Sequence, residues 1–141
     1  MARIKIEIPE KFIFTTEIPI RISDINYNGH LGNDAVLSLA QEARLRFLNK
    51  YGFTELDIAG TGIIMIDAEI QYKAEGFYGD TLTIELGIKE ITNTGCDIVY
   101  QITNKNNKKV IAIVKTGIVF FDYKKRKVVT TPKEFLNVIN A

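Results

Sequence analysis

Residues 24–44 read Asp24-Ile-Asn-Tyr-Asn-Gly-His-Leu-Gly-Asn-Asp-Ala-Val-Leu-Ser-Leu-Ala-Gln-Glu-Ala-Arg44, and this stretch decides the fold. Its first half is a polar loop that holds the only histidine of the chain, and its second half has the composition of a helix. Asn33 or Asp34 can cap that helix, because their side-chain oxygens can accept from its first unpaired N–H groups. Polar side chains beside the outward-pointing N–H groups of a helix start indicate a site for a carbonyl or an anion.

The helix is expected to run to about Lys50 and to stop at Gly52, since glycine commonly ends helices. Its residues are apolar or small almost all the way round, which predicts a buried helix rather than one lying on a surface. Glu42 lies among these apolar neighbours, on one stripe with Ala35 and Ser38. A carboxylate in such surroundings would be partly desolvated, which would raise its pKa toward that of a useful base.

Alternation of apolar and polar residues predicts strands on both sides of the helix. The strands before it are expected at 4–8 and at about 12–22, where Pro19 favours an edge position or a bulge. The strands after it are expected at about 64–72, 80–89, 96–103 and 109–121, with a short piece at 128–130 and a second helix that starts at Pro132. The segment 109–121 is apolar on both faces, which predicts a central strand. One long helix with an antiparallel sheet makes an α+β fold, in a single domain over residues 1–141.

The composition excludes several classes of protein. With 18 basic and 17 acidic residues the net charge is +1, and no nucleic-acid-binding motif is present. No apolar run approaches the ~20 residues of a membrane span, and the first residues lack the apolar core of a signal peptide. Cys96 is the only cysteine, so no internal disulfide can form and a reducing compartment is indicated. We therefore expect a cytoplasmic protein that binds neither nucleic acid nor membrane.

The segment 24–44 resembles the signature of the hotdog-fold acyl-CoA thioesterases of the 4-hydroxybenzoyl-CoA thioesterase-like group. That signature is roughly Asp-x-Asp-x-x-Gly-His-Val-Asn-Asn, followed by a helix that carries Glu-Ala-Arg. The chain matches it without gaps at 24–33 and again at 42–44. Weaker similarities follow at Tyr72-Lys73, Gly79-Asp80, Phe121-Asp122 and 131–134, so the resemblance covers about residues 12–136.

The resemblance implies a strongly bent antiparallel sheet of five or six strands wrapped around one central helix. It implies a homodimer or a homotetramer with active sites at the subunit interface. The implied reaction is hydrolysis of an acyl thioester of coenzyme A or of an acyl carrier protein. No cofactor is needed, because coenzyme A is part of the substrate, and a lone histidine with scattered carboxylates lacks the spacing of a metal site.

One position departs from the family pattern. Many members have a catalytic aspartate where this chain has Asn26, and a neutral amide cannot accept a proton as a carboxylate does. The amide can orient water or hold the thioester by hydrogen bonds. Another residue must then act as the catalytic carboxylate, and the candidates are Glu42, Asp24 and Asp34.

These considerations give a set of expected roles. Glu42 activates water or attacks directly, and Asn26 and Asn33 orient the reacting groups. Asp24, His30, Gly32 and Asp34 form the substrate-binding part, in which Gly32 lets the substrate approach the N–H groups of the helix start.

Each assignment has a plainer alternative. Glu42 can form an ion pair with Arg46, Asp34 can be a helix cap, and Asp24 can fix the loop. His30 can pack in the loop and bond a backbone carbonyl. The basic run 124–127 is either a solvated hairpin tip or a contact for coenzyme A phosphates.

Two other functions stay open. The loop Asp24-x-Asn26…His30 has a vague similarity to that of hotdog enoyl-CoA hydratases, although the proline is absent and the histidine lies one residue too far along. Asn26 is also compatible with a protein that binds acyl-CoA without hydrolysing it.

Overall fold

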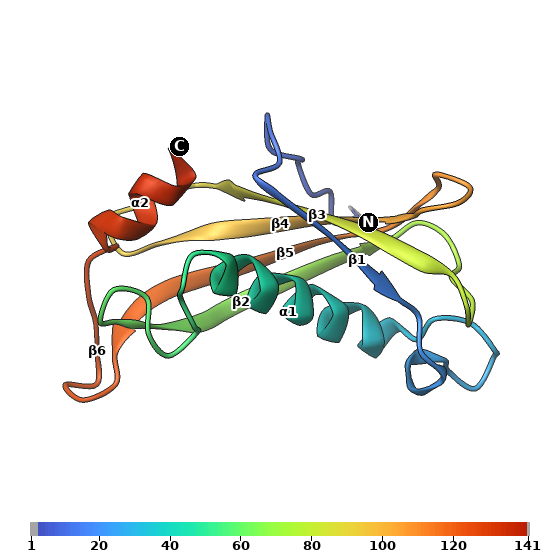
Figure 1. The fold of residues 1–141 in the computed structure, drawn as a ribbon, viewed down its shortest axis with the longest axis horizontal. Helices are drawn as coiled ribbons and strands as arrows, with labels where there is room; N and C mark the ends of the chain where they lie inside the picture. Colours follow the sequence, from blue (N-terminus) through green and yellow to red (C-terminus); the bar gives the residue numbers. More distant parts are fainter. Residues whose placement is uncertain (1–2, 141) are drawn as a thin grey trace.

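The computed structural model describes residues 3–140, which form one antiparallel sheet crossed by a single long helix (Figure 1). The strands are β1 (Phe14–Pro19), β2 (Gly62–Tyr72), β3 (Thr81–Lys89), β4 (Gly95–Asn104), β5 (Val110–Asp122) and β6 (Lys127–Val128). The helices are α1 (Asn33–Lys50) and α2 (Lys133–Ile139), with a 3-10 turn at Ile22–Asp24. The predicted α+β hotdog architecture, with a curved sheet and one long helix, is confirmed.

The sheet has the order β1-β3-β4-β5-β2, and β6 pairs with the end of β5. β5 lies between β4 and β2, as its two apolar faces predicted. β1 is an edge strand that ends at Pro19, a residue that cannot donate to a ladder. β2 forms the opposite edge, and its pairing with β5 shifts register between Met65 and Asp67.

Helix α1 crosses the sheet and buries one face against it (Figure 1). The buried residues recur at helical spacing and meet the inward side chains of the central strands: Val36, Leu39, Ala40, Ala43, Arg44, Phe47 and Leu48. The prediction of a helix buried all the way round is wrong for the single chain, because Leu37 and Leu45 are 39% and 38% exposed. A sheet covers only one side of a helix, so the other side needs a second layer to become buried.

The N-terminal strand expected at 4–8 is not formed, and residues 3–13 run as irregular chain. Alternation alone does not supply a pairing partner, and the outer edge of β3 is already occupied by β1. The other predicted strands form within a few residues of their expected bounds, and the helix ends before Gly52, whose φ is +76°.

Candidate active site

The loop before α1 is held closed by Asp24. Its carboxylate is 5% exposed and accepts from the Arg21 backbone N–H at 2.9 Å and from the Arg21 guanidinium at 3.2 Å. The Asp24 carbonyl accepts from the Gly32 N–H at 2.9 Å, which ties the two ends of the loop together. The observed contacts of Asp24 are therefore those of a loop-fixing residue.

Asn26 shapes the inside of the same loop. Its Oδ1 accepts from the N–H groups of Asn28 and His30, at 3.0 and 3.4 Å. Its own N–H donates to the His30 carbonyl at 2.8 Å, and Gly29 makes the reversal with φ +87°. These bonds fix the orientation of the amide, so its Nδ2 is left as a donor with no partner among residues 3–140.

The start of α1 is not capped by any side chain. The cap position is Gly32, with φ −72°, and the expected caps Asn33 and Asp34 lie inside the first turn. The cap prediction is wrong because the chain turns one residue earlier than the sequence pattern indicates. Gly32 is buried, and a methyl group there would lie 2.7 Å from Asp34 Oδ1 and 3.5 Å from Asn26 Cβ. An alanine there would therefore require the exposed Asp34 carboxylate to move, and no side chain caps the first N–H groups of the helix.

A hollow of about 380 Å³ lies beside this helix start and brings three of the predicted residues together. It is lined by Asn26, His30, Leu31, Asn33, Tyr72, Lys73, Ala74 and Glu75. The Tyr72 hydroxyl donates to the Asn33 carbonyl at 3.0 Å, and so joins the end of β2 to the start of α1. The His30 ring packs edge-on against Phe77, with the ring centroids 6.5 Å apart.

Sequence reasoning missed part of this lining. Tyr72 and Lys73 carry only a weak family similarity, and nothing in the sequence points to Glu75. These residues reach the hollow because the segment after β2 lies against the loop, where the Leu31 N–H donates to the Gly76 carbonyl at 2.7 Å.

Glu42 lies away from the hollow. It follows Asn33 by nine residues, about two and a half helical turns, and so lies on the opposite side of α1. Its side chain is 49% exposed and pairs with Arg46 at 2.8 Å, while Arg46 also donates to Thr16 and to the Glu17 carbonyl of β1. The expectation that Glu42 lies among apolar neighbours is therefore wrong for the single chain.

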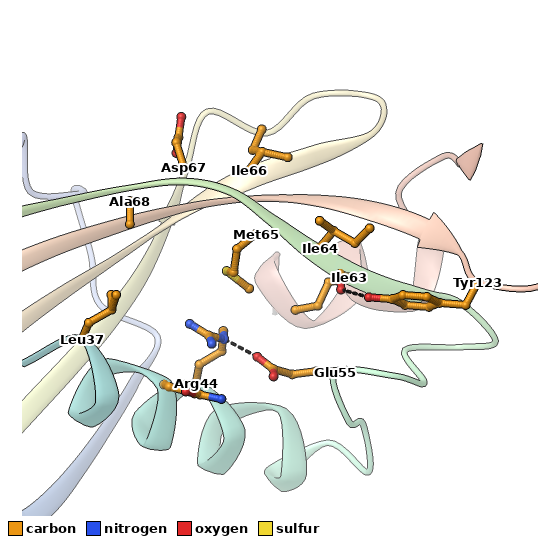
Figure 2. A pocket seen from close by; sticks show the side chains of 11 residues that line it. Leu37, Arg44, Glu55, Ile63, Ile64, Met65, Ile66, Asp67, Ala68 and Tyr123 are labelled. Atoms are coloured by element: carbon orange, nitrogen blue, oxygen red, sulfur yellow. Dashed lines mark hydrogen bonds and ion pairs between the residues drawn. The ribbon is translucent and has the colours of Figure 1, made fainter. Parts of the chain in front are cut away.

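A second cavity, of about 550 Å³, continues along α1 next to β2 (Figure 2). Leu37, Gln41 and Arg44 contribute to it, and they follow Asn33 on the same stripe of the helix. In Figure 2 the Met65 side chain points from β2 toward the Arg44 guanidinium and the Leu37 side chain points from α1 toward β2, whereas Ile66 and Asp67 point away. This cavity, which we call the α1–β2 groove, shares no lining residue with the hollow.

A buried polar network borders this groove. Arg44 binds the Glu55 carboxylate through Nε and the Tyr100 hydroxyl through Nη1, the latter at 2.9 Å. The Tyr100 hydroxyl also bonds Thr116 Oγ1 at 2.9 Å. Burial raises the pKa of Tyr100, although the nearby Arg44 charge opposes this shift, so the phenol stays protonated.

Two further observations bear on the chemistry of the site. Residues 3–140 contain no group of three histidine, cysteine, aspartate or glutamate side chains placed to hold a metal ion. No helix in this part of the chain is long and apolar enough to span a membrane.

Comparison with known proteins gives a consistent result. A family model described as "Thioesterase-like superfamily" matches residues 20–139. A relative from Aquifex aeolicus (strain VF5) named "Putative esterase" is 29% identical over 101 residues, which cover 70% of this chain and 76% of the relative.

Solved structures share the fold at low sequence identity. A 1,4-dihydroxy-2-naphthoyl-CoA thioesterase from Synechocystis has a TM-score of 0.82 and 21% identity, over 90% of this chain and 95% of that one. A Staphylococcus aureus protein solved in complex with CoA has a TM-score of 0.81 and 14% identity, over 96% of this chain and 86% of that one.

Proposed function

This chain belongs to the thioesterase-like superfamily, and we propose that it hydrolyses acyl thioesters of coenzyme A at the hollow beside the start of α1. Thioester hydrolysis is the activity of the superfamily. One observation carries the assignment to this place, namely an uncapped helix start that opens onto a hollow lined by Asn26, His30 and Asn33.

The helix start supplies the electrostatic part of the reaction. The thioester carbonyl accepts from the N–H groups of the first turn of α1 and from Asn26 Nδ2, and negative charge develops on its oxygen during attack. Losing one such donor costs about 2.7–4 kcal/mol in other enzymes of acyl transfer. The role expected for Gly32, to let the substrate approach these amides, stays a prediction.

The proton-transfer part is assigned to His30. A neutral imidazole suits a general base near pH 7, and the ring lines the hollow. It takes a proton from water as the oxygen attacks the carbonyl carbon. The tetrahedral intermediate then expels the thiolate, which takes up the proton, so that the products are the free acid and the thiol. Asn33 orients the water, and Glu75 is the carboxylate among the residues that line the hollow.

The earlier candidate, Glu42, can act only if its carboxylate reaches the hollow of another subunit, since it lies on the far side of α1 in its own chain. We therefore leave the predicted catalytic role of Glu42 out of the proposed mechanism, whereas Asp34 stays a candidate for binding the substrate near the helix start. Within one chain the geometry favours His30 over either carboxylate as the base.

The basic run 124–127 forms the exposed tip of the β5–β6 hairpin. It lies at the end of the sheet where Gly62 pairs with Phe121, whereas the hollow lies at the Tyr72 end of β2, about 33 Å away. Lys73 lines the hollow itself, so we assign it the contact with the phosphates of coenzyme A.

We further propose that two copies pair through the edge of β2. This strand of 11 residues has a partner on one side only among residues 3–140, and Met65 and Ile66 are 39% and 60% exposed. Pairing there would wall off the open side of the α1–β2 groove. Sedimentation analysis should give twice the mass of the chain, and an Ile66→Lys variant should shift the population toward monomer.

The activity test is hydrolysis of a panel of acyl-CoA esters with detection of the released thiol. We expect turnover that His30→Gln reduces at least 100-fold and that Glu42→Gln leaves unchanged. Loss of activity in a folded Glu42→Gln variant with activity retained in His30→Gln would reverse our assignment. If the protein hydrolyses no acyl-CoA ester but does hydrolyse thioesters of an acyl carrier protein, then coenzyme A is the wrong carrier, whereas the proposed site is retained.

Neither rival function gains support from the relatives described above. Hydration of crotonyl-CoA would establish the hydratase alternative, and tight acyl-CoA binding by calorimetry without any turnover would establish the non-catalytic one.

A further inference from the structure

The His30 ring forms no hydrogen bond within residues 3–140. Asn26 fixes the backbone of His30 through two hydrogen bonds, but neither ring nitrogen has a partner in this part of the chain. A catalytic base is usually oriented by a third group that bonds it from behind. Because no described residue bonds the imidazole in this way, a packing contact must hold the ring if His30 is to act as the base.

One aromatic side chain makes such a contact. Phe77 lies edge-on to His30, with the ring centroids 6.5 Å apart and the ring planes at 88° to each other. Aromatic rings prefer this arrangement, at centroid separations of about 4.5–7 Å. Within residues 3–140 no other aromatic ring pairs with His30, and Phe77 pairs with no other ring.

The Phe77 ring projects from a well-fixed turn. The Phe77 N–H donates to the Asp80 carboxylate at 3.0 Å, and the Phe77 carbonyl accepts from the Asp80 N–H at 3.0 Å. Gly79 lies within this turn at φ +92°, a conformation that residues with side chains rarely adopt. The Asp80 carbonyl accepts from the Ile20 N–H at 2.8 Å, which joins the turn to the residue after β1.

The same turn is held against the loop that carries His30. The Leu31 N–H donates to the Gly76 carbonyl at 2.7 Å. A Cβ atom on Gly76 would lie 2.9 Å from Ile20 Cδ1 and 3.5 Å from Leu31 Cβ, so the two segments approach closely at this point. Leu31 follows His30 and Gly76 precedes Phe77 in the sequence. The two chains that carry the ring pair are therefore bonded to each other next to it.

Phe77 does not serve the core of the protein. It is 49% exposed and is not among the side chains that form or cover the buried cluster. The next residue, Tyr78, is also aromatic and is 65% exposed, but it makes no ring contact with His30. Phe77 thus differs from its neighbour in its contact with a residue that lines the hollow.

We propose that Phe77 is a positioning residue, whose ring holds the His30 imidazole in the orientation that the reaction needs. This inference rests on the proposed thioesterase function and on His30 as its base. Phe77 acts through His30 and not through the substrate. Its loss should therefore lower turnover and leave substrate binding nearly unchanged.

The kinetic test compares Phe77→Ala with Tyr78→Ala, using the best acyl-CoA ester of the panel. We expect kcat of Phe77→Ala to fall about tenfold with KM within about twofold of the unmodified value, because the imidazole leaves its productive orientation part of the time. Tyr78→Ala should change neither constant. Phe77→Tyr keeps the ring and can place its hydroxyl in water, so it should restore kcat. If Phe77→Ala does not fold, Phe77→Leu replaces it, since leucine keeps apolar volume without a flat ring.

A second readout needs no turnover. His30 is the only histidine of the chain, so its ring protons give a single set of imidazole signals in NMR spectra. We expect nuclear Overhauser contacts between these protons and the Phe77 ring, and we expect Tyr78→Ala to keep them. Their absence in the unmodified protein would overturn the inference.

The kinetic outcomes separate this inference from the proposed function. Normal kcat in a folded Phe77→Ala variant overturns the inference and leaves the thioesterase function intact, and so does a loss of kcat that Phe77→Tyr fails to restore. Full activity of His30→Gln removes the base that Phe77 would orient, and so overturns the inference too. If the unmodified protein hydrolyses no acyl thioester, the proposed function is rejected together with the inference.

Discussion

Removal of the Tyr100 hydroxyl should destabilise the protein more than its single oxygen atom suggests. Tyr100 has 0% exposure, and its hydroxyl bonds both Arg44 Nη1 and Thr116 Oγ1 at 2.9 Å. Tyr100→Phe therefore removes the partner of a charged donor and the partner of a second buried hydroxyl. A hydrogen bond to a charged group contributes about 1.5–3 kcal/mol and a neutral one about 1 kcal/mol. Arg44 can turn toward the groove and replace part of the lost bond there. We therefore expect the free energy of unfolding to fall by about 2–3 kcal/mol in total.

Tyr123→Phe is the matched control for this change. The Tyr123 hydroxyl donates to the Ile63 carbonyl at 2.8 Å, but the residue is 43% exposed. Water can replace that bond, so the expected loss is about 0.5 kcal/mol.

Urea unfolding of both variants, extrapolated linearly to water, gives the two free energies of unfolding. Adding Thr116→Val to Tyr100→Phe should recover part of the loss, because it removes the hydroxyl that was left without a partner. The reasoning is refuted if Tyr100→Phe loses no more stability than Tyr123→Phe, or if the two substitutions at 100 and 116 act additively.

Three further outcomes follow from the structure. Gly32→Ala should lower kcat about tenfold, because its methyl group would lie 2.7 Å from Asp34 Oδ1 and force that carboxylate to move within the first turn of α1; Ser38→Ala on the exposed side of α1 is the control, and normal kcat in Gly32→Ala would contradict a role of the Asp34 position in the reaction. Burial raises the pKa of the Cys96 thiol to about 12, so Ellman's reagent should label it only after denaturation, and rapid labelling of the native protein would contradict this. Burial and neighbouring carboxylates raise the pKa of Asp97 despite the opposing Lys115, so the ionised form disfavours folding. Asp97→Asn should therefore raise Tm at pH 7, and the gain should vanish below the ordinary aspartate pKa of about 3.9; an equal gain at pH 7 and at about pH 3 would contradict this.

The elements with strong local signals could be predicted from the sequence. The helix after the polar loop, its end before Gly52 and the central position of 110–122 all follow from apolar periodicity and glycine placement. The strand expected at 4–8 failed because alternation shows which residues can share a face but not whether a neighbouring strand is available. Pairing partners are a property of the whole sheet.

The site was predicted less completely, for a similar reason. Asn26, His30 and Asn33 lie within eight residues of one another, so their meeting in one hollow could be foreseen. Glu75 comes from a segment more than forty residues away, and only the contact between loops brings it to the hollow. The exposed position of Glu42 in the single chain could not be predicted, because the sequence shows that a helix has two apolar sides but not which of them the sheet covers.

The bare edge of β2 also has consequences for how the protein behaves when handled. A long strand with unpaired N–H and C=O groups and exposed apolar side chains is a template for uncontrolled association with other extended chains. The other edge of the sheet is protected by Pro19 at the end of β1. Partial unfolding, which frees the edge of β2 from its surroundings, should therefore promote aggregation that starts at this strand.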